Sequence, residues 1–314
     1  MDMENFYIAL NAVVPLFCLM LVGVFIKRMR LLSPEELVHV NRMVFTIFFS
    51  IMMFYNIYTT DLSSTFKPGL MLFGLLSVIG IFLAALVVVC FFDKDNRRRG
   101  ALIQSQFRSN FVLMGIPLVG NMFGPEEVAV TTMMVAVIVP AYNVFGVITL
   151  ETFRGKKFAL LPIFIGVLKN PMILGALTGA LLLLLGVPVP KAVLKPLGQI
   201  TAATSPLALI ILGASFSFGS VSRCKLQLVL GVLGKLVIFP AIVMFLAMEL
   251  GFRGGDFLTL ISIFCTPCAV ASFAMAQQMD SDAELAGNLV VFTSAISCVT
   301  IFCWILFFKG IGMF

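Results

Sequence analysis

The amino-acid sequence predicts an all-α polytopic membrane protein with ten transmembrane helices, arranged as two inverted repeats of five. Three observations support this fold class: the composition, the long charge-poor runs, and the uneven placement of Lys and Arg. Of 314 residues, 61% are hydrophobic and 11% are charged, against about 45–50% and about 25% in soluble domains. A soluble chain of this composition would expose too much apolar surface, which excludes most soluble enzymes and nucleic-acid binders.

Ten runs are long enough to cross the hydrocarbon core, which needs about 20 apolar residues. The first run is not a cleaved signal peptide, because acidic Asp2 and Glu4 precede it where a signal peptide would be basic. The predicted spans are Phe6–Ile26, Val38–Tyr58, Pro68–Phe92, Ala101–Phe123, Val128–Leu150, Asn170–Val187, Leu197–Phe218, Leu226–Leu250, Phe257–Gln278 and Ala283–Phe308.

The basic residues predict the orientation of these spans. Thirteen Lys and Arg residues follow spans one, three, five and seven, and five lie on the opposite side. The thirteen include Lys169, because Asn170-Pro171 is typical of a helix cap followed by a first-turn proline, so 158–168 would lie along the membrane surface. Because cytoplasmic loops carry the excess of positive charge, we expect a multi-pass protein of the cell membrane with both termini outside.

The spacing of weak internal similarities predicts the inverted repeat. Glu127 before span five and Glu284 before span ten lie 157 positions apart, and the same offset relates Asn110 to Pro267. Because five is odd, a second set of five spans must run inverted relative to the first. We therefore expect one repeat in residues 1–155 and another in 156–314, a pattern typical of transporters with a site at the midplane.

Spans four and nine carry the polar groups expected of such a site. Span four contains Gln104 to Asn110, including Arg108 and Ser109, and span nine contains Thr266 and Pro267. Pro267 removes a backbone donor and frees a carbonyl that needs another partner in hydrocarbon. Two breaks that cross at mid-membrane would offer helix N-termini, which favour anions, whereas a lone proline would merely kink its helix.

The charges predicted to lie within the membrane also favour an anionic substrate. No Asp or Glu lies in the middle of a span, whereas the cations Arg108 and Lys235 lie within spans four and eight. An intramembrane charge costs about 2.5–3.5 kcal/mol or more and marks a functional site by default. Arg108 could instead extend toward the cytoplasm. Lys235 could bond backbone carbonyls at a packing site instead of adding positive potential to an anion path. Tyr142 and Asn143 could line the site or join helices by hydrogen bonds.

The chain resembles the auxin efflux carrier family, which includes the plant PIN-FORMED exporters and bacterial organic-acid permeases. The resemblance covers nearly the whole chain and rests on several short motifs in the same order. They are Asn41-Arg42, the run from Asn110 to Pro117, the segment 150–155, Lys169-Asn170-Pro171, and Thr266-Pro267 through Ala286. The chain departs from the family at Ser109, where plant members have proline, and at Ser50, where many members have proline. It also has only a short segment between spans five and six, where plant members have a long loop.

The resemblance implies a scaffold of spans one, two, six and seven and a moving domain of spans three to five and eight to ten. It places the substrate carboxylate near the crossover of helices four and nine, beside Asn110 and Pro267, and it implies a homodimer. We expect Asn110 to donate its amide to a carboxylate, Ser109 and Thr266 to add hydroxyls, and Arg108 to raise the local positive potential.

The predicted function is a secondary transporter for a small organic anion that needs no cofactor or metal and works by alternating access in a lipid bilayer. An anion channel and a non-transporting ligand sensor on the same fold are the alternatives. A membrane enzyme would need paired aspartates, a Ser/His pair or zinc ligands, but the one histidine, His39, lies at a predicted interface. Protons are a candidate coupling ion, and sodium coupling or none stays open.

Overall fold

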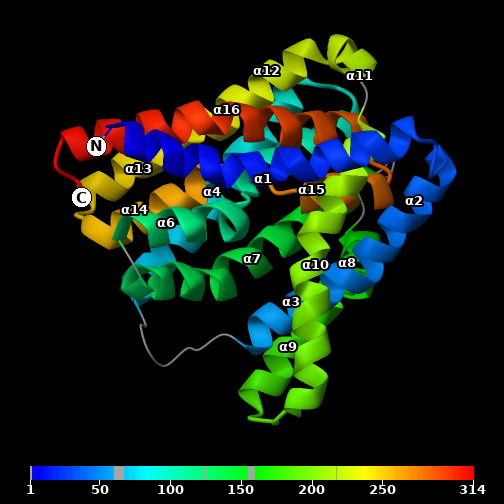
Figure 1. Ribbon diagram of the computed structural model, residues 1–314, viewed down its shortest axis with the longest axis horizontal. Coiled ribbons are helices and arrows are strands. Elements are labelled where there is room, and N and C mark those ends of the chain that lie inside the picture. The colour runs from blue at the N-terminus through cyan, green and yellow to red at the C-terminus, as the bar shows by residue number, and fades with distance from the viewer. Residues whose placement is uncertain (1, 60–66, 124, 155–159, 217) are drawn as a thin grey trace.

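We analysed a computed structural model that describes residues 2–59, 67–123, 125–154, 160–216 and 218–314. Every regular element within these ranges is a helix, and η marks a π-helical turn (Figure 1). The elements are α1 Asp2–Arg28, α2 Pro34–Met43, η1 Val44–Phe48, α3 Phe49–Tyr58, α4 Pro68–Phe92, α5 Asn96–Phe107, η2 Phe111–Gly115, α6 Ile116–Phe123, α7 Pro125–Arg154, α8 Leu160–Lys169, α9 Pro171–Leu184, α10 Lys191–Ser215, α11 Phe218–Arg223, α12 Lys225–Leu233, η3 Gly234–Ile238, α13 Phe239–Glu249, α14 Gly254–Phe264, α15 Ala271–Gln278 and α16 Ala283–Gly310.

Within the described residues, six helical stretches are long and apolar enough to cross a membrane, and three further apolar helices are shorter. The long ones are Pro34–Tyr58, Pro68–Phe92, Glu127–Arg154, Lys191–Ser215, Lys225–Glu249 and Ala283–Gly310; the shorter ones are Phe111–Phe123, Pro171–Leu184 and Gly254–Phe264. This is the architecture of a polytopic, all-helical membrane protein, as the composition predicts. The ten crossings and their inverted arrangement stay predictions.

Each predicted span overlaps one helix or two to three consecutive helical segments. The cap predicted at Asn170 is confirmed, because its Oδ1 accepts a hydrogen bond from the Met172 amide over 3.0 Å and Pro171 begins α9. The surface segment predicted at 158–168 corresponds to α8 from Leu160 onward. Residues 158 and 159, and the predicted repeat boundary between 155 and 156, lie outside the described residues.

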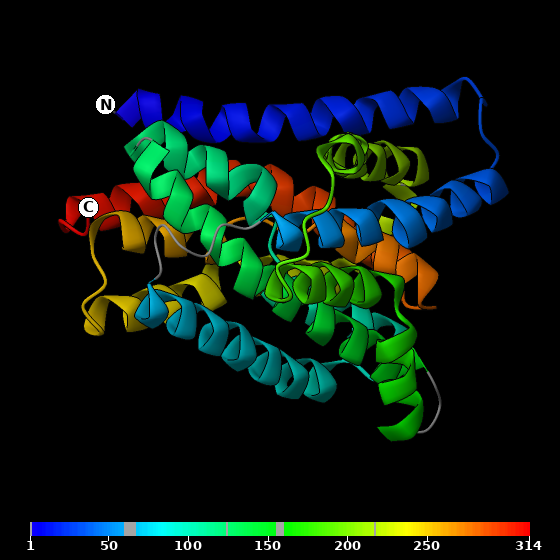
Figure 2. The ribbon, with the colours of Figure 1, turned by 90° about the horizontal axis from the view of Figure 1, so that it is seen from below.

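Small residues, among them Gly175 and Gly179, let several helices pack closely. A side chain on Gly175 would collide with the Ser50 carbonyl, and one on Gly179 would approach the Phe54 carbonyl to 2.6 Å, so α9 lies directly against α3. Helix α1 runs beside α16, with its first turn and the end of α16 at the same end of the molecule (Figures 1 and 2). This placement agrees with an even number of crossings.

Two helices are interrupted, and their interruptions meet. Helix α5 ends at Phe107 and the chain resumes as η2 at Phe111, whereas α14 ends at Phe264 and the chain resumes as α15 at Ala271. The backbone N–H of Asn110 donates to the Pro267 carbonyl over 2.8 Å, and the backbone N–H of Ala269 donates to the Arg108 carbonyl over 3.3 Å. Ser109 and Cys268 form an isolated antiparallel bridge. These bonds give the extended segments the partners that helix carbonyls and amides lose at a break.

Candidate functional site

A small cavity of about 80 Å³ lies against the meeting point of the two interrupted helices. Residues of both interruptions contribute to it, together with side chains from α3, α7, α9 and α10. Its lining is Phe49, Met52, Met53, Asn56, Arg108, Ser109, Asn110, Val112, Leu113, Val139, Tyr142, Asn143, Met172, Ser205, Ala269, Val270 and Ala271. The structure thus brings five predicted site residues together: Arg108, Ser109, Asn110, Tyr142 and Asn143.

Arg108 is a buried cation beside this cavity, with 2% of its surface exposed. One terminal nitrogen, Nη2, donates to Asn143 Oδ1 over 3.1 Å, and Nη1 contacts the sulfur of Met275. None of the ion pairs among the described residues involves Arg108, and its Nε has no hydrogen-bond partner there. A buried charge without a counter-ion is costly, so the site favours a ligand that brings a negative charge.

Asn110 contributes a second unfilled donor. Its side chain is buried, and its Nδ2 has no hydrogen-bond partner among the described residues. An unsatisfied buried amide costs about 1–3 kcal/mol, so an acceptor on a ligand in the cavity would recover that energy. Arg108 and Asn110 are two residues apart on the extended segment, and both line the same cavity.

Ser109 and Tyr142 form a hydrogen-bonded pair on the same wall. The Ser109 hydroxyl donates to the carbonyl of Ile263, and it therefore accepts the Tyr142 hydroxyl, whose oxygen lies 3.0 Å from Ser109 Oγ. The side-chain amide nitrogen of Asn143 donates to the sulfur of Met53 over 2.7 Å. These bonds tie α7 to the interruption of span four and to α3, and they orient the donors around the cavity.

The two helices that resume after the interruptions begin at the cavity. The first residues of η2–α6 and of α15, including Val112 and Ala271, are in its lining. The first turn of a helix has backbone amides without intrahelical acceptors and carries a partial positive charge. Among the described lining residues there is no Asp or Glu, and Arg108 is the one that is always charged. The electrostatic potential of the cavity is therefore positive.

Three other predicted site residues lie outside the lining. The Thr266 hydroxyl donates to the Ser262 carbonyl over 2.8 Å, and Pro267 contributes its carbonyl to Asn110. Lys235 is buried on α12–η3–α13, where its Nζ donates to the Gln106 carbonyl over 3.4 Å. Pro267 thus holds the backbone of Asn110 without lining the cavity, and Lys235 donates a hydrogen bond to the last turn of α5.

Two polar lining residues, Asn56 and Ser205, were absent from the sequence prediction. Each carries a signal that could have identified it. Asn56 is a polar residue inside the apolar run of the second span, and Ser205 directly precedes Pro206 within α10. Their place beside the cavity depends on how α3 and α10 pack, which spacing along the chain does not encode.

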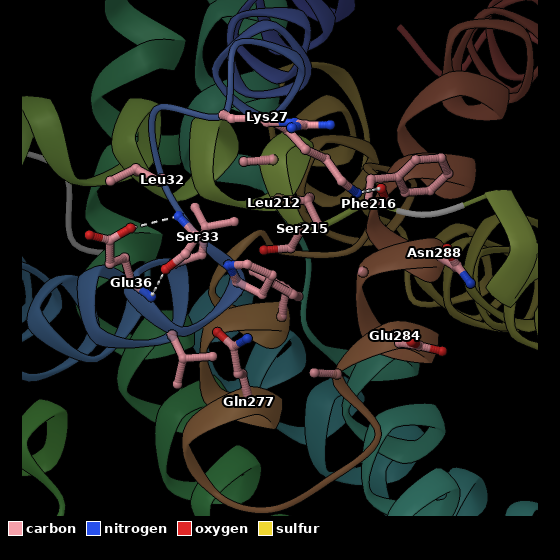
Figure 3. A pocket seen from close by; sticks show the side chains of 18 residues that line it. Lys27, Leu32, Ser33, Glu36, Leu212, Ser215, Phe216, Gln277, Glu284 and Asn288 are labelled. Carbon is pink, nitrogen blue, oxygen red and sulfur yellow. Dashed lines mark hydrogen bonds between the residues drawn. The ribbon is translucent and has the colours of Figure 1, made fainter.

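A larger basin of about 700 Å³ opens where α1 ends and α2 begins (Figure 3). Its lining combines this corner of the chain with the end of α10 and with α15 and α16, and it carries Lys27, Arg30, Glu36 and Glu284. Figure 3 shows Lys27 bonded to the Phe216 carbonyl, a bond of 2.7 Å. Both α10 and α15 contribute residues to the basin and to the small cavity, so the two hollows lie along the same two helices.

A multi-helix membrane protein with a buried, positively charged cavity and an open basin along the same helices has the features of a transport protein. Sequence comparison agrees. The chain belongs to the membrane transport protein family, which it matches over residues 8–160 and 157–305. The resemblance to the auxin efflux carriers is thereby confirmed, and the chain is a transport protein rather than an enzyme.

Two archaeal relatives match nearly their whole length. An uncharacterized transporter of Methanocaldococcus jannaschii is 24% identical over 309 residues, which cover 95% of this chain and 98% of the relative. An uncharacterized transporter of Methanothermobacter thermautotrophicus is 22% identical over 301 residues, covering 94% of this chain and 96% of the relative. The chain is thus similar to transporters whose names specify no substrate.

Proposed function

We propose that this protein is a secondary transporter that carries a small organic anion, with a carboxylate bound in the cavity beside the two interrupted helices. The observation that carries the proposal is the unpaired charge of Arg108. This buried guanidinium and the unpartnered amide of Asn110 both face a cavity whose described lining contains no acidic residue. A carboxylate would supply the missing counter-charge and accept from both donors.

Asn110 donates its side-chain amide to the carboxylate in this proposal, and Arg108 supplies the charge. The Tyr142 and Ser109 hydroxyls, the Asn143 amide and the first-turn amides of η2 and α15 complete the polar wall. Thr266, Pro267 and Lys235 act behind the cavity, since none of them is in its lining. The apolar side of the lining, which includes Met52 and Val139, suits a substrate with a hydrocarbon part.

The positions of helix ends support the proposed inverted repeat of residues 1–155 and 156–314. Four helical stretches, two from each half, are each 25 residues long. Corresponding ends in the two halves lie 157 positions apart, the offset already seen between Glu127 and Glu284. The pairs are Pro34 and Lys191, Tyr58 and Ser215, Pro68 and Lys225, Phe92 and Glu249, and the interruption points Phe107 and Phe264.

The location of both hollows supports alternating access. The cavity has α3, α9 and α10 of the expected scaffold on one side and the interrupted helices with α7 of the expected moving domain on the other. The basin likewise lies between α1, α2 and α10 and the pair α15 and α16. Movement between these groups would open and close a path to the cavity. With the proposed orientation, the termini outside and the basin at the cytoplasmic face, the path in this conformation leads inward.

The test is uptake by purified protein reconstituted into liposomes. Radiolabelled mono- and dicarboxylates are screened with and without a proton gradient, and Asn110→Ala is compared with wild type. Loss of uptake by Asn110→Ala with unchanged thermal stability supports the site. The matched control is Asn121→Ala, since Asn121 is exposed on α6 and outside the lining, and it should transport like wild type.

Two further readouts separate a carrier from its alternatives. Saturable flux that is accelerated by unlabelled substrate on the opposite side indicates a carrier, whereas non-saturating flux without such counterflow indicates an anion channel. Ligand binding without flux indicates a sensor. Uptake by Asn110→Ala equal to wild type would remove the assignment of the site.

A further inference from the structure

A third hollow, separate from the small cavity and the basin, lies on the outer side of α5. This lipid-facing groove has a volume of about 340 Å³ and runs between α4 and the line of α12, η3 and α13, with α5 as its floor. Its lining is Ala84, Ala85, Val88, Val89, Phe92, Asp93, Leu102, Gln106, Leu226, Gln227, Leu230, Gly231, Gly234, Ile238, Phe239 and Ile242. It shares no lining residue with the small cavity or the basin.

The groove is apolar and faces outward over most of its length. Val88 is 49% exposed and Ile238 is 52% exposed, and α4 lies along the outside of the helix bundle (Figure 2). In a protein that crosses a bilayer, side chains exposed at this depth contact lipid. The chemistry that suits the groove is therefore a hydrocarbon chain of the membrane.

The two walls of the groove differ in length. Its lining on α4 runs from Phe92 to Ala84, about 12 Å at 1.5 Å per residue, and on the facing helix line from Leu226 to Ile242, about 24 Å. The hydrocarbon core of a bilayer is about 30 Å thick, so one leaflet is about 15 Å. A chain that enters at Phe92 and Leu226, where both helices reach the membrane edge, would thus lie between both walls for most of one leaflet and contact α13 beyond it.

The membrane-edge end of the groove carries a surplus of positive charge. Lys94 directly follows Asp93, the groove residue just past the end of α4, and Lys225, the first residue of α12, directly precedes the groove residue Leu226. Both lysines are exposed, and neither belongs to an ion pair among the described residues.

The acidic side chain at this end is already engaged. Asp93 Oδ2 accepts from Gln227 Nε2 over 2.9 Å and lies 3.4 Å from Arg98 Nε, while Arg99 donates to the Asp93 carbonyl over 2.6 Å. Asp95 pairs with the same Arg98 and caps α5. The two lysines are therefore left to attract an anion at the membrane surface.

We propose that the groove binds an anionic phospholipid, with one acyl chain between α4 and α12–α13 and the phosphate at Lys94 and Lys225. Basic residues at the membrane edge attract anionic headgroups by about 1 kcal/mol each, and the groove supplies the specific place for the chain. The floor residue Gln106 lies next to Phe107, where α5 ends. A lipid bound here would therefore press on the helix that leads into the anion cavity.

The test is native mass spectrometry of the full chain with phosphatidylglycerol and phosphatidylcholine that have identical acyl chains. We expect wild type to retain one phosphatidylglycerol at least about tenfold more tightly than phosphatidylcholine. Lys94→Gln/Lys225→Gln, which alters exposed residues only, should weaken phosphatidylglycerol binding by about fivefold per lysine and bring the two lipids to similar affinity.

A pair of variants on α4 tests the groove itself. Ala84→Phe places a ring in the groove and should abolish retention of either lipid, whereas Leu83→Phe, on an exposed neighbour outside the lining, should leave it unchanged. Equal affinity of wild type for the two lipids, or wild-type retention by Ala84→Phe, would overturn the proposal. Unchanged selectivity in the lysine double variant would overturn the assignment of the headgroup.

Discussion

Arg108 and Lys235 are both buried cations, each 2% exposed, and both lie close to the end of α5. Their partners differ. Lys235 donates to the Gln106 carbonyl, one of the last carbonyls of α5, where a cation stabilises the negative end of a helix. Arg108 lies past that end, faces a cavity, and keeps an unpartnered Nε. The comparison indicates that burial of a charge does not by itself identify a ligand site. An unfilled donor that faces a cavity does, as in Arg108, whereas Lys235 has a carbonyl partner.

The strongest test of this difference is the replacement of Arg108. Arg108→Gln removes the counter-charge for the anion and its charge-assisted hydrogen bonds, which contribute about 1.5–3 kcal/mol each. We expect uptake of the transported carboxylate to fall by about a hundredfold with little change in thermal stability. The control is Arg28→Gln, at the exposed end of α1, which should retain uptake. Full uptake by Arg108→Gln would show that Arg108 serves the fold alone.

The interruption of span nine should matter next. Pro267→Ala restores a backbone N–H and lets α14 extend past Phe264. This would displace the carbonyl of residue 267, which accepts from the backbone N–H of Asn110. We expect about a tenfold lower uptake rate. Pro196→Ala provides the control, since Pro196 is an exposed proline within α10 and its replacement should change uptake less than twofold. Equal effects of the two variants would contradict a specific role for the interruption.

Lys235→Met should affect stability rather than affinity. Without the ammonium group the Gln106 carbonyl loses its partner, at a cost of about 1–3 kcal/mol. We expect the melting temperature in detergent to fall by several degrees while KM stays within about twofold of wild type. Lys191→Met, at the exposed start of α10, is the control. A weakened anion affinity at unchanged stability would instead place Lys235 on the anion path.

The smallest expected effect is that of Ser109. Ser109→Ala removes the hydroxyl that accepts from Tyr142 and donates to Ile263, so the cavity wall loosens without loss of charge. We expect KM to rise about threefold to tenfold at similar maximal rate. Ser222→Ala, which removes an exposed bond to the Gly219 carbonyl, should leave KM unchanged.

The sequence predicted the helices well because their signals are local. Apolar runs, the Asn170-Pro171 cap and the proline of span nine each act through neighbours in the chain, and each predicted span contains a helix. The polar run from Gln104 to Asn110 likewise marked the place where α5 ends. The polar residues that spans four and five contribute to the small cavity were predicted for the same reason.

Contacts between distant segments could not be predicted in the same way. The pairing of Ser109 with Cys268, and the places of Asn56 and Ser205 beside the cavity, depend on how whole helices pack. The π-helical turn at Gly234–Ile238 also takes part in a distant contact, since its Leu236 carbonyl accepts from Trp304 Nε1 over 3.0 Å. Lys235 lies on this turn, so its bond to the Gln106 carbonyl of α5 could not be predicted from the sequence.

The most direct test of the account is equilibrium binding of the transported carboxylate to purified wild type, Arg108→Gln and Lys235→Met, each checked for folding by its melting temperature. The account predicts about a hundredfold weaker binding by Arg108→Gln and binding within about twofold of wild type by Lys235→Met. Wild-type affinity in Arg108→Gln would contradict the claim that an anion binds beside the two interrupted helices.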